Sequence, residues 1–276
     1  MRVQKYKKRL DAYIQNLCTF AVLINMCSNM FDANKTKEQL IVWIREWFER
    51  NGPGCNAIVG VSGGKDSTIV AALCKEALGA DRVIGISMPD KNQGVNDADE
   101  ICNFLGIRYM RISIEEVTAA MSRICDGTGV NAFELSHQAQ QNIPPRVRMM
   151  VEYAVGQTYN GRVSCNCNLS EDWIGYSTRW GDASGDFSPF ANLTVTEVRQ
   201  IGHALGLPSK WVEKTPDDGL PHSSPDEVKF GFTYETLDKY IRGIETPPED
   251  IRLKIDNMHA KNLFKLKMPE GFMPEL

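Results

Sequence analysis

The sequence predicts an α/β fold with a doubly wound parallel sheet, helices on both faces and a helical C-terminal part. The apolar run 57–61 has the length and β-branched content of a buried parallel strand, and further strands are expected at 83–87 and 107–112. Amphipathic segments of helical length follow these runs after short loops. Strands that alternate with helices in this way form parallel sheets, whose ligands lie at the carboxyl ends of the strands.

The first 29 residues stand apart from this pattern. A basic opening precedes the apolar run 17–24, as in the n- and h-regions of a secretory signal. Residues 28–30, Ser-Asn-Met, make a poor cleavage site. We therefore expect residues 1–29 to be an N-terminal extension and residues 30–276 to form a single domain.

The first helix of the domain is expected over 36–50. Thr36 and Gln39 have the spacing of a capping box, and a broad apolar face follows them. Turn residues at 51–54 end this helix, and the first strand comes next. Beyond the strand and its loop, apolar residues at helical spacing predict a second helix that stops at Gly79.

The rest of the chain alternates predicted helices with predicted strands. The elements after the second strand are helices over 96–105 and 114–125, a helix with Pro144 and Pro145 in its first turn that runs to about residue 160, a short strand at 163–165, a helix opened by a capping box of Thr194 and Glu197, and helices over 234–243 and 248–262.

Composition narrows the function classes. The net charge is −4, so the chain has no general attraction to nucleic acid. No apolar run reaches membrane-spanning length. The 8 cysteines are scattered along a long chain, which favours a reducing cytoplasm over a disulfide framework. We expect a cytoplasmic protein that binds neither nucleic acid nor membrane.

The loop Ser62-Gly63-Gly64-Lys65-Asp66-Ser67 carries the strongest functional signal. A strand that turns through paired glycines into a helix leaves backbone N–H groups and the positive end of the helix dipole facing one spot. The sequence cannot be fitted to the Walker A pattern. An aspartate at the mouth of a phosphate site repels phosphate unless a cation lies between them, so Asp66 predicts a Mg²⁺ ion shared with phosphate oxygens.

This loop resembles the pyrophosphate-binding loop of the N-type ATP pyrophosphatases, which split ATP into AMP and pyrophosphate. Further segments extend the resemblance to the ammonia-dependent NAD⁺ synthetase family, in order and at the family's spacing. The matching segments are 62–67, 142–149, 168–171, 175–182, 214–216 and 234–238. The likeness covers the chain from Trp43 to the C-terminus.

The resemblance implies a reaction. Nicotinic acid adenine dinucleotide (deamido-NAD⁺) attacks the α-phosphorus of ATP, pyrophosphate leaves, and ammonia then displaces AMP to give the amide. ATP is a co-substrate and Mg²⁺ the implied cofactor. The family pairs as a symmetric dimer, so a homodimer with the dinucleotide site at the shared surface is expected.

The resemblance also implies site residues. Asp66, Asp182 and Lys65 are the expected catalytic residues, with Asp182 holding ammonium and taking its proton, and Asp66 with Glu171 is the expected metal pair. Contacts to ATP are expected from Gly60, Val61, Ser62, Gly63, Gly64, Lys65, Asp66, Ser67, Ser87, Met88, Asn166, Lys214 and Asp217. Contacts to the dinucleotide are expected from Asn142, Arg146, Arg179, Asp186 and Lys265.

The sequence departs from the family pattern at four positions. The family often has threonine where Asn166 stands, lysine at Val195, serine or threonine at Asp217 and histidine near Phe264. The loss of a cation at position 195 predicts that Lys65 supplies the missing charge to the phosphates. Lys214 is the next candidate.

Two rival functions fit the same loop. A sulfurtransferase of the superfamily would adenylate a tRNA base or a carboxylate and then use a cysteine, with Cys125, Cys165 and Cys167 as candidates. The acidic pI of about 5.7 argues against a tRNA substrate. A non-enzymatic nucleotide sensor is the third reading. The pair Cys165 and Cys167 could also be half of a zinc site, but no second pair follows at ligand spacing.

Overall fold

The computed structural model describes residues 31–90, 95–125, 134–214, 226–269 and 271–274. The expected extension, 1–29, and the predicted ATP contact Asp217 therefore lie outside the described residues. The remaining predicted site residues lie within them.

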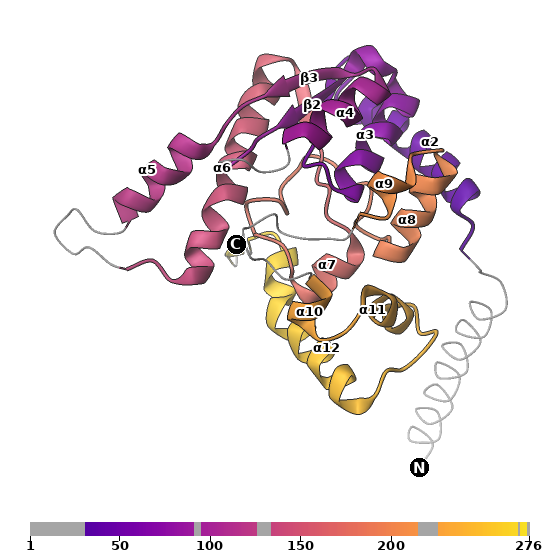
Figure 1. Cartoon of the computed structure of the whole chain (residues 1–276), viewed down its shortest axis with the longest axis vertical. Helices are drawn as coiled ribbons and strands as arrows, with labels where there is room; N and C mark the ends of the chain where they lie inside the picture. The colour runs from indigo at the N-terminus through magenta and orange to yellow at the C-terminus, as the bar shows by residue number, and fades with distance from the viewer. Residues whose placement is uncertain (1–30, 91–94, 126–133, 215–225, 270, 275–276) are drawn as a thin grey trace.

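The centre of the fold is a four-stranded parallel sheet (Figure 1). Its strands are β1 (Asn56–Gly60), β2 (Val83–Ser87), β3 (Arg108–Arg111) and β4 (Gly161–Val163), and they lie in the order β3-β2-β1-β4. Ile58 of β1 pairs with Ile84 of β2 on one side and with Val163 of β4 on the other. The predicted parallel sheet is confirmed. The last strand ends two residues earlier than expected, since Ser164 forms only an isolated bridge with Phe187.

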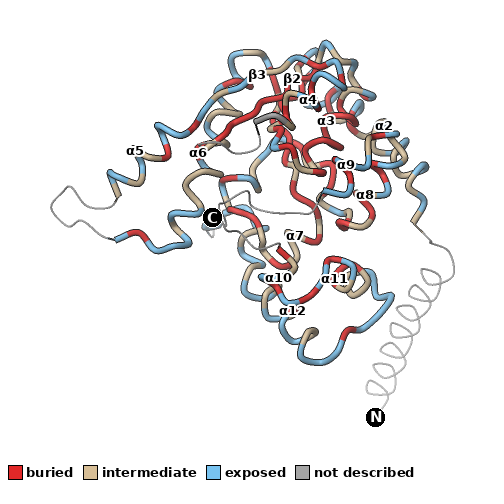
Figure 2. Tube along the Cα trace, in the orientation of Figure 1, coloured by how far each residue is buried: buried red, intermediate tan, exposed pale blue. Residues whose placement is uncertain are grey.

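Helices cover both faces of the sheet, as predicted. On one face, side chains from β1 and β2 pack with α2 (Ala33–Asn51), α3 (Lys65–Leu78), α4 (Val95–Leu105), α8 (Val195–Ala204) and α9 (Ser209–Val212). On the other face, Ile58, Ile84 and Ile86 pack against α6 (His137–Thr158), which in turn contacts α5 (Glu115–Cys125). Figure 2 shows buried residues concentrated on β2 and on α3, whereas β3 carries none. These two apolar layers hold the sheet between them.

A separate hydrophobic cluster supports the helical C-terminal part. It joins α7 (Leu169–Ile174), α10 (Asp226–Phe230), α11 (Tyr234–Ile241) and α12 (Glu249–Asn262), with Val195 at its edge. Short 3₁₀ turns lie at Ala80–Arg82 and Leu263–Leu266. These helices form the lower half of the molecule in Figure 1.

The ends of two helices differ from the sequence prediction. The side chain of Asp32 accepts a hydrogen bond from Lys35 N–H and caps α2, so the helix starts before the expected capping box at Thr36. α6 begins at His137 with a Ser136 cap, which leaves Pro144 and Pro145 inside the helix. Proline lacks the N–H that an interior position uses, so packing of the α6 side chains, Val147 and Val155 among them, must outweigh the loss. The Thr194–Glu197 capping box is confirmed.

Candidate functional site

The strand order creates a switch point beside β1. The chain runs outward from β1 to β2 and β3 and then returns to place β4 on the other side of β1. The loops that follow β1 and β4 therefore diverge at the carboxyl edge of the sheet, which is where doubly wound proteins bind ligands. Both loops carry predicted site residues, Ser62–Ser67 after β1 and Asn166 after β4.

The loop after β1 is built from local hydrogen bonds. Ser62 Oγ accepts a bond from Gly64 N–H at 3.2 Å, and Ser67 Oγ donates to Gly64 O at 3.2 Å. Gly63 has φ +83°, and a Cβ there would lie 2.8 Å from Cβ of Asp97. Glycine is required at this position on both counts. Gly64 caps α3 without a side-chain bond, so the first N–H groups of α3 have no side-chain cap.

Lys65 and Asp66 form a buried ion pair at the start of α3. Lys65 Nζ lies 2.7 Å from Asp66 Oδ2, and the lysine side chain is 2% exposed. Burial alone would lower the pKa of Lys65, but the attraction of Asp66 and Glu171 outweighs burial and raises the pKa. Lys65 therefore stays charged and faces two carboxyl groups.

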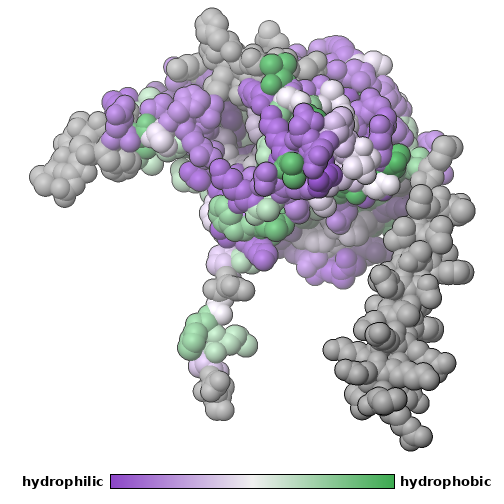
Figure 3. All heavy atoms as spheres, turned by 90° about the horizontal axis from the view of Figure 1, so that it is seen from below, coloured by the Kyte–Doolittle hydropathy of each residue, from purple (hydrophilic) through white to green (hydrophobic). Residues whose placement is uncertain are grey.

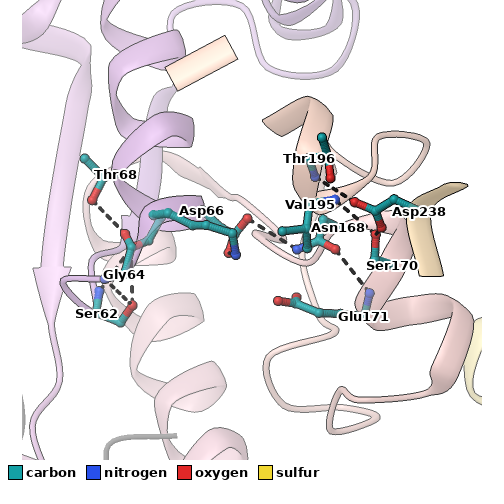
Figure 4. Close-up of polar contacts among 12 residues, drawn as sticks. Ser62, Gly64, Asp66, Thr68, Asn168, Ser170, Glu171, Val195, Thr196 and Asp238 are labelled. Atoms are coloured by element: carbon teal, nitrogen blue, oxygen red, sulfur yellow. Dashed lines mark hydrogen bonds and ion pairs between the residues drawn. The ribbon is translucent and has the colours of Figure 1, made fainter. Parts of the chain in front are cut away.

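Glu171 reaches the same place from α7. Asn168 caps α7 by accepting Glu171 N–H at 3.1 Å, and its amide donates to Asp66 Oδ1 at 3.3 Å (Figure 4). Burial, reinforced by the negative charge of Asp66, raises the pKa of Glu171 to about 8. One asparagine thus positions the two predicted metal ligands relative to each other.

The amino end of α8 is occupied by the protein itself. Asp238 accepts Thr196 N–H at 2.8 Å and Ser170 Oγ–H at 2.5 Å, and Ser170 Oγ accepts Val195 N–H at 3.0 Å (Figure 4). Val195 is fully buried and packs in the C-terminal hydrophobic cluster. The departure at position 195 therefore fits a core position, with its N–H group already bonded.

Other predicted nucleotide contacts surround the loop. Asn166 donates to Gly60 O at 3.1 Å, and Lys214 Nζ donates to Gly63 O at 3.1 Å and to Asp97 at 2.6 Å. At the end of β2, Ser87 and Met88 are both buried, and Met88 Cε would be 3.3 Å from a Cβ on Gly60. The structure brings these residues to the same edge of the sheet.

Asp182 lies in the segment after α7. Its carboxylate accepts Thr178 N–H at 2.9 Å, and Thr178 Oγ1 donates to Asn142 Oδ1 at 2.9 Å. Asp182 is open to solvent, yet the protein around it desolvates the carboxyl and raises its pKa in spite of that hydrogen bond. Glu171 and Lys265 both experience the charge of Asp182. Asp182 therefore lies within electrostatic range of Glu171, one of the two predicted metal ligands.

The predicted dinucleotide contacts separate into three places. Lys265 donates to Gly175 O at 2.7 Å and to Ser177 O at 3.3 Å. Arg179 donates to Lys267 O at 2.9 Å and stacks over Phe264, while its Nε is buried and has no hydrogen-bond partner among the described residues. These two cations join the Asp182 segment to the C-terminal residues. Their contact with a substrate stays a prediction.

Of the other three predicted dinucleotide residues, Asn142 bonds Thr178 in the Asp182 segment, and Arg146 and Asp186 lie apart. Arg146 is exposed on α6 and forms no hydrogen bond or ion pair with the described residues. Asp186 instead accepts Val163 N–H at 2.8 Å and Tyr153 O–H at 3.4 Å. Because β4 is an edge strand, Asp186 satisfies an N–H that no neighbouring strand can reach. This gives Asp186 a structural role that the sequence did not predict.

Glu152 is the charged residue near the site that sequence reasoning missed. It projects from α6 against Gly60, where any Cβ would collide with Glu152 Oε1. Burial raises the pKa of Glu152 to about 8, and Arg148 partly offsets that rise. Arg148 lies one turn earlier on α6 and donates to Met88 O at 3.1 Å. The i, i+4 spacing of this pair on a predicted helix was the available signal.

The switch-point glycine loop, the open amino end of α3 and the converging acids define an α/β nucleotide-binding protein. Comparisons with known proteins name the family. A model of the NAD synthase family matches residues 36–269. The chain therefore belongs to the NAD synthase family, and the resemblance drawn from its motifs is confirmed.

Relatives and solved structures agree with this assignment. The chain is 37% identical over 204 residues to an NH₃-dependent NAD⁺ synthetase of Methanococcus aeolicus, covering 73% of this chain and 78% of that relative. It is 36% identical to that of Thermococcus sibiricus, covering 82% and 85%. The NAD synthetase of Campylobacter jejuni superposes with a TM-score of 0.72 at 26% identity, covering 88% and 100%. An NMN synthetase of Francisella tularensis superposes with a TM-score of 0.80 at 27% identity, covering 89% and 100%.

Proposed function

We propose that this protein is an amide-forming ligase that converts deamido-NAD⁺, ATP and ammonia into NAD⁺, AMP and pyrophosphate through an adenylated intermediate. The observation that carries the proposal is the family match over residues 36–269 together with the glycine loop at the switch point of the sheet. This match favours amide formation over the sulfur transfer that the same loop also serves. ATP is a substrate of this family.

The loop residues are suited to hold the leaving pyrophosphate. The uncapped N–H groups at the start of α3 and the hydroxyls of Ser62 and Ser67 are oriented toward one place. Such donors stabilise the negative charge that develops as the α-phosphorus is attacked. Lys214, which already contacts Gly63, adds a cation at the rim of the loop. We assign adenylation of the dinucleotide to this region.

Asp182 is suited to the second step. Its carboxylate is open to solvent, is held by Thr178 N–H and has a raised pKa. An acid in this state can bind ammonium and accept a proton from it as the nitrogen attacks the adenylated carbonyl. AMP then leaves. The cations Arg179 and Lys265 lie beside this segment and suit the anionic groups of the dinucleotide.

The donor set at Asp66 and Glu171 fits Mg²⁺. The residues that the structure describes offer no cluster of three or more metal-binding side chains. Asp66 and Glu171 come from separate elements and are both held by Asn168. A protein usually supplies one or two carboxylates to Mg²⁺, and phosphate and water oxygens provide the remaining ligands. When bound, the ion would neutralise charge on the phosphate oxygens. Lys65 contributes a fixed positive charge to the same acids.

One observation favours a second substrate. The structure with a TM-score of 0.80 is an NMN synthetase, while the NAD synthetase of Campylobacter jejuni gives 0.72. The same two half-reactions on nicotinic acid mononucleotide would yield nicotinamide mononucleotide. That substrate lacks the adenylate half of the dinucleotide, so the two reactions differ only in the size of the acceptor.

A single assay distinguishes these functions. Purified protein with ATP, Mg²⁺ and ammonium is given deamido-NAD⁺ or nicotinic acid mononucleotide at equal concentration, and AMP and the amide product are both measured. We expect AMP and NAD⁺ in equal amounts, with kcat/KM for the dinucleotide exceeding that for the mononucleotide. The reverse order assigns the mononucleotide function, and AMP formed only with a sulfur donor overturns both.

We also propose a homodimer in the cytoplasm. α5 exposes Val117, Met121 and Ile124 along one side, and α5 with the first turns of α6 extends away from the sheet (Figure 1). Apolar atoms also gather on the protruding C-terminal segment, where Phe272 is 90% exposed (Figure 3). Exposed apolar stripes of this kind usually meet a partner. All described cysteines are free, which suits a reducing compartment.

Sedimentation tests the dimer. Met121→Glu places a charge in the middle of the α5 stripe and should yield a monomer at micromolar concentration. Glu116→Gln, on the same helix but outside the stripe, is the matched control and should stay dimeric. A wild-type monomer with full activity refutes the proposal.

Among the helices that the structure describes, none combines the length and the apolar character that a membrane span requires.

A further inference from the structure

Cys165 and Cys167 lie close to the site but have no role in the proposed reaction. They lie in the segment between β4 and α7, on either side of the predicted nucleotide contact Asn166. Both thiols are buried, at 8% and 6% exposure. The described residues offer no third ligand that would make them part of a metal site. Their surroundings differ from those of the other described cysteines.

The two thiols converge on one atom. Cys165 Sγ lies 3.7 Å and Cys167 Sγ 3.3 Å from the carbonyl oxygen of Asp182, and each thiol affects the pKa of the other. Residues two apart have Cα atoms no more than about 7 Å apart. Disulfides span Cα separations of about 4.4–6.8 Å. The two sulfurs can therefore join with a small backbone adjustment.

The other cysteines that the structure describes have different surroundings. Cys74 and Cys102 lie in the hydrophobic core, and burial raises the pKa of each to about 12. Cys55 donates to Asn160 Oδ1. In contrast, the neighbouring Cys167 lowers the pKa of Cys165, while the pKa of Cys167 is raised. A cysteine of lowered pKa beside a second cysteine that can resolve its sulfenic acid is the pair that peroxide-sensitive dithiols use.

We propose that Cys165 and Cys167 form a peroxide-sensitive dithiol whose oxidation to a disulfide switches off the ligase. The Cys165 thiolate attacks one oxygen of hydrogen peroxide, the O–O bond breaks, and a sulfenic acid forms with release of hydroxide. The thiol of Cys167 then attacks that sulfur, the S–S bond forms and water leaves. In sum, two thiols and one hydrogen peroxide give one disulfide and two waters, and an external thiol reverses the reaction.

The disulfide would disturb both halves of the site. It removes two S–H groups from the backbone oxygen of Asp182, and Cys167 Sγ also lies 3.9 Å from the Asp182 carboxylate. The new ring encloses Asn166, whose amide donates to Gly60 O at the base of the loop. Gly185 packs directly against Cys165, since a Cβ there would lie 2.4 Å from Cys165 N, so a backbone adjustment at Cys165 would also act on the Asp182 segment. Loss of activity rests on the proposed function, whereas disulfide formation does not.

A peptide measurement tests the chemistry separately from the activity. Cleavage at Arg162 and Arg179 releases residues 163–179, which contain these two cysteines and no other. After graded hydrogen peroxide and alkylation, we expect this peptide without alkyl groups and 2 Da lighter than the dithiol, and at least tenfold less NAD⁺ formation, both restored by dithiothreitol. Cys125→Ser, a matched control on α5, should behave as wild type.

Three outcomes would overturn the proposal. The peptide could remain doubly alkylated at peroxide levels that oxidise Cys125, or pass directly to sulfinic acid, and either result excludes the dithiol. A disulfide that leaves NAD⁺ formation unchanged excludes the switch. Cys167→Ala should stop at the sulfenic stage, form no disulfide and keep its NAD⁺ formation after peroxide. If the unoxidised enzyme forms no NAD⁺, the proposed function fails while the peptide result still decides the dithiol.

Discussion

The loop after β1 and the segment around Asp182 hold their acids in different ways. In the loop, Ser62, Gly64 and Ser67 bond to one another across at most five residues. Asp66 pairs with the adjacent Lys65 and accepts one distant bond, from Asn168. Asp182 also takes a local bond from Thr178, but Thr178 in turn depends on Asn142, which is 36 residues away. A locally bonded loop is fixed once its strand and helix form, whereas the Asp182 segment needs the assembled domain. We infer that the loop tolerates distant substitutions better than the segment does.

Removing Asp66 should have the largest effect. Asp66→Asn takes one carboxylate from the metal pair and leaves Lys65 without its partner. Loss of a group that stabilises transition-state charge costs roughly 10²- to 10³-fold in kcat. We expect both adenylation and amide formation to fall by this factor, as measured by pyrophosphate exchange and by NAD⁺ formation. Exchange at the wild-type rate would exclude Asp66 from the first step.

A substitution of Lys65 should have a smaller effect than one of Asp66. Lys65→Gln removes a buried cation that faces Asp66 and Glu171. We expect kcat/KM for ATP to fall by roughly tenfold to a hundredfold, corresponding to about 1.4–2.8 kcal/mol, with little change in the KM for deamido-NAD⁺. Lys75→Gln, on the same helix but away from the loop, is the control. An unchanged ATP dependence would move the role to Lys214.

Glu152 lies between the two regions and should make stability depend on pH. The pKa of Glu152 in the folded protein is raised to about 8 from an ordinary 4.5, so between these values the folded state holds one more proton than the unfolded state. Stability therefore falls as pH rises through this window and levels off above it. Glu152→Gln should abolish that fall.

Chemical unfolding of wild type and Glu152→Gln at several pH values measures the effect. The variant should gain roughly 1–3 kcal/mol of unfolding free energy over wild type between pH 5 and pH 8. The comparison isolates Glu152, because all other titrating groups are shared. A constant difference across this range would show that Glu152 titrates normally.

The smallest effect is expected from the support of the Asp182 segment. Thr178→Val keeps the shape of the side chain but loses the hydrogen bond to Asn142. The loss of one such bond costs about 0.5–1.5 kcal/mol of unfolding free energy. Thr68→Val breaks a bond of 2.7 Å within the loop region. For the same loss of unfolding free energy, we expect Thr178→Val to lower kcat more than Thr68→Val does. Equal losses in both variants would remove the distinction between the two regions.

The same contrast explains what the sequence could predict. Strand β2, the glycine loop and the Thr194 cap depend on neighbours in the chain, and each was predicted with its residues. The start of α6 was missed because two prolines favour a first turn, and only packing keeps them inside a helix. The structural bond from Asp186 to the edge of β4 depends on strand order, which no local pattern contains. Glu152 was missed for a similar reason, since it faces Gly60 across 92 positions of the chain.

In the proposed reaction the loop carries adenylation, and Asp182 carries the attack of ammonia. Asp182→Asn keeps the size of the side chain and its acceptor for Thr178 N–H but loses the proton acceptor. General acid–base groups contribute typically 10²- to 10⁴-fold. The decisive measurement is pyrophosphate exchange dependent on deamido-NAD⁺, made beside NAD⁺ formation in this variant. We predict exchange near the wild-type rate and NAD⁺ formation reduced by about 10²-fold or more. Equal loss of both would contradict the division of labour between the two regions.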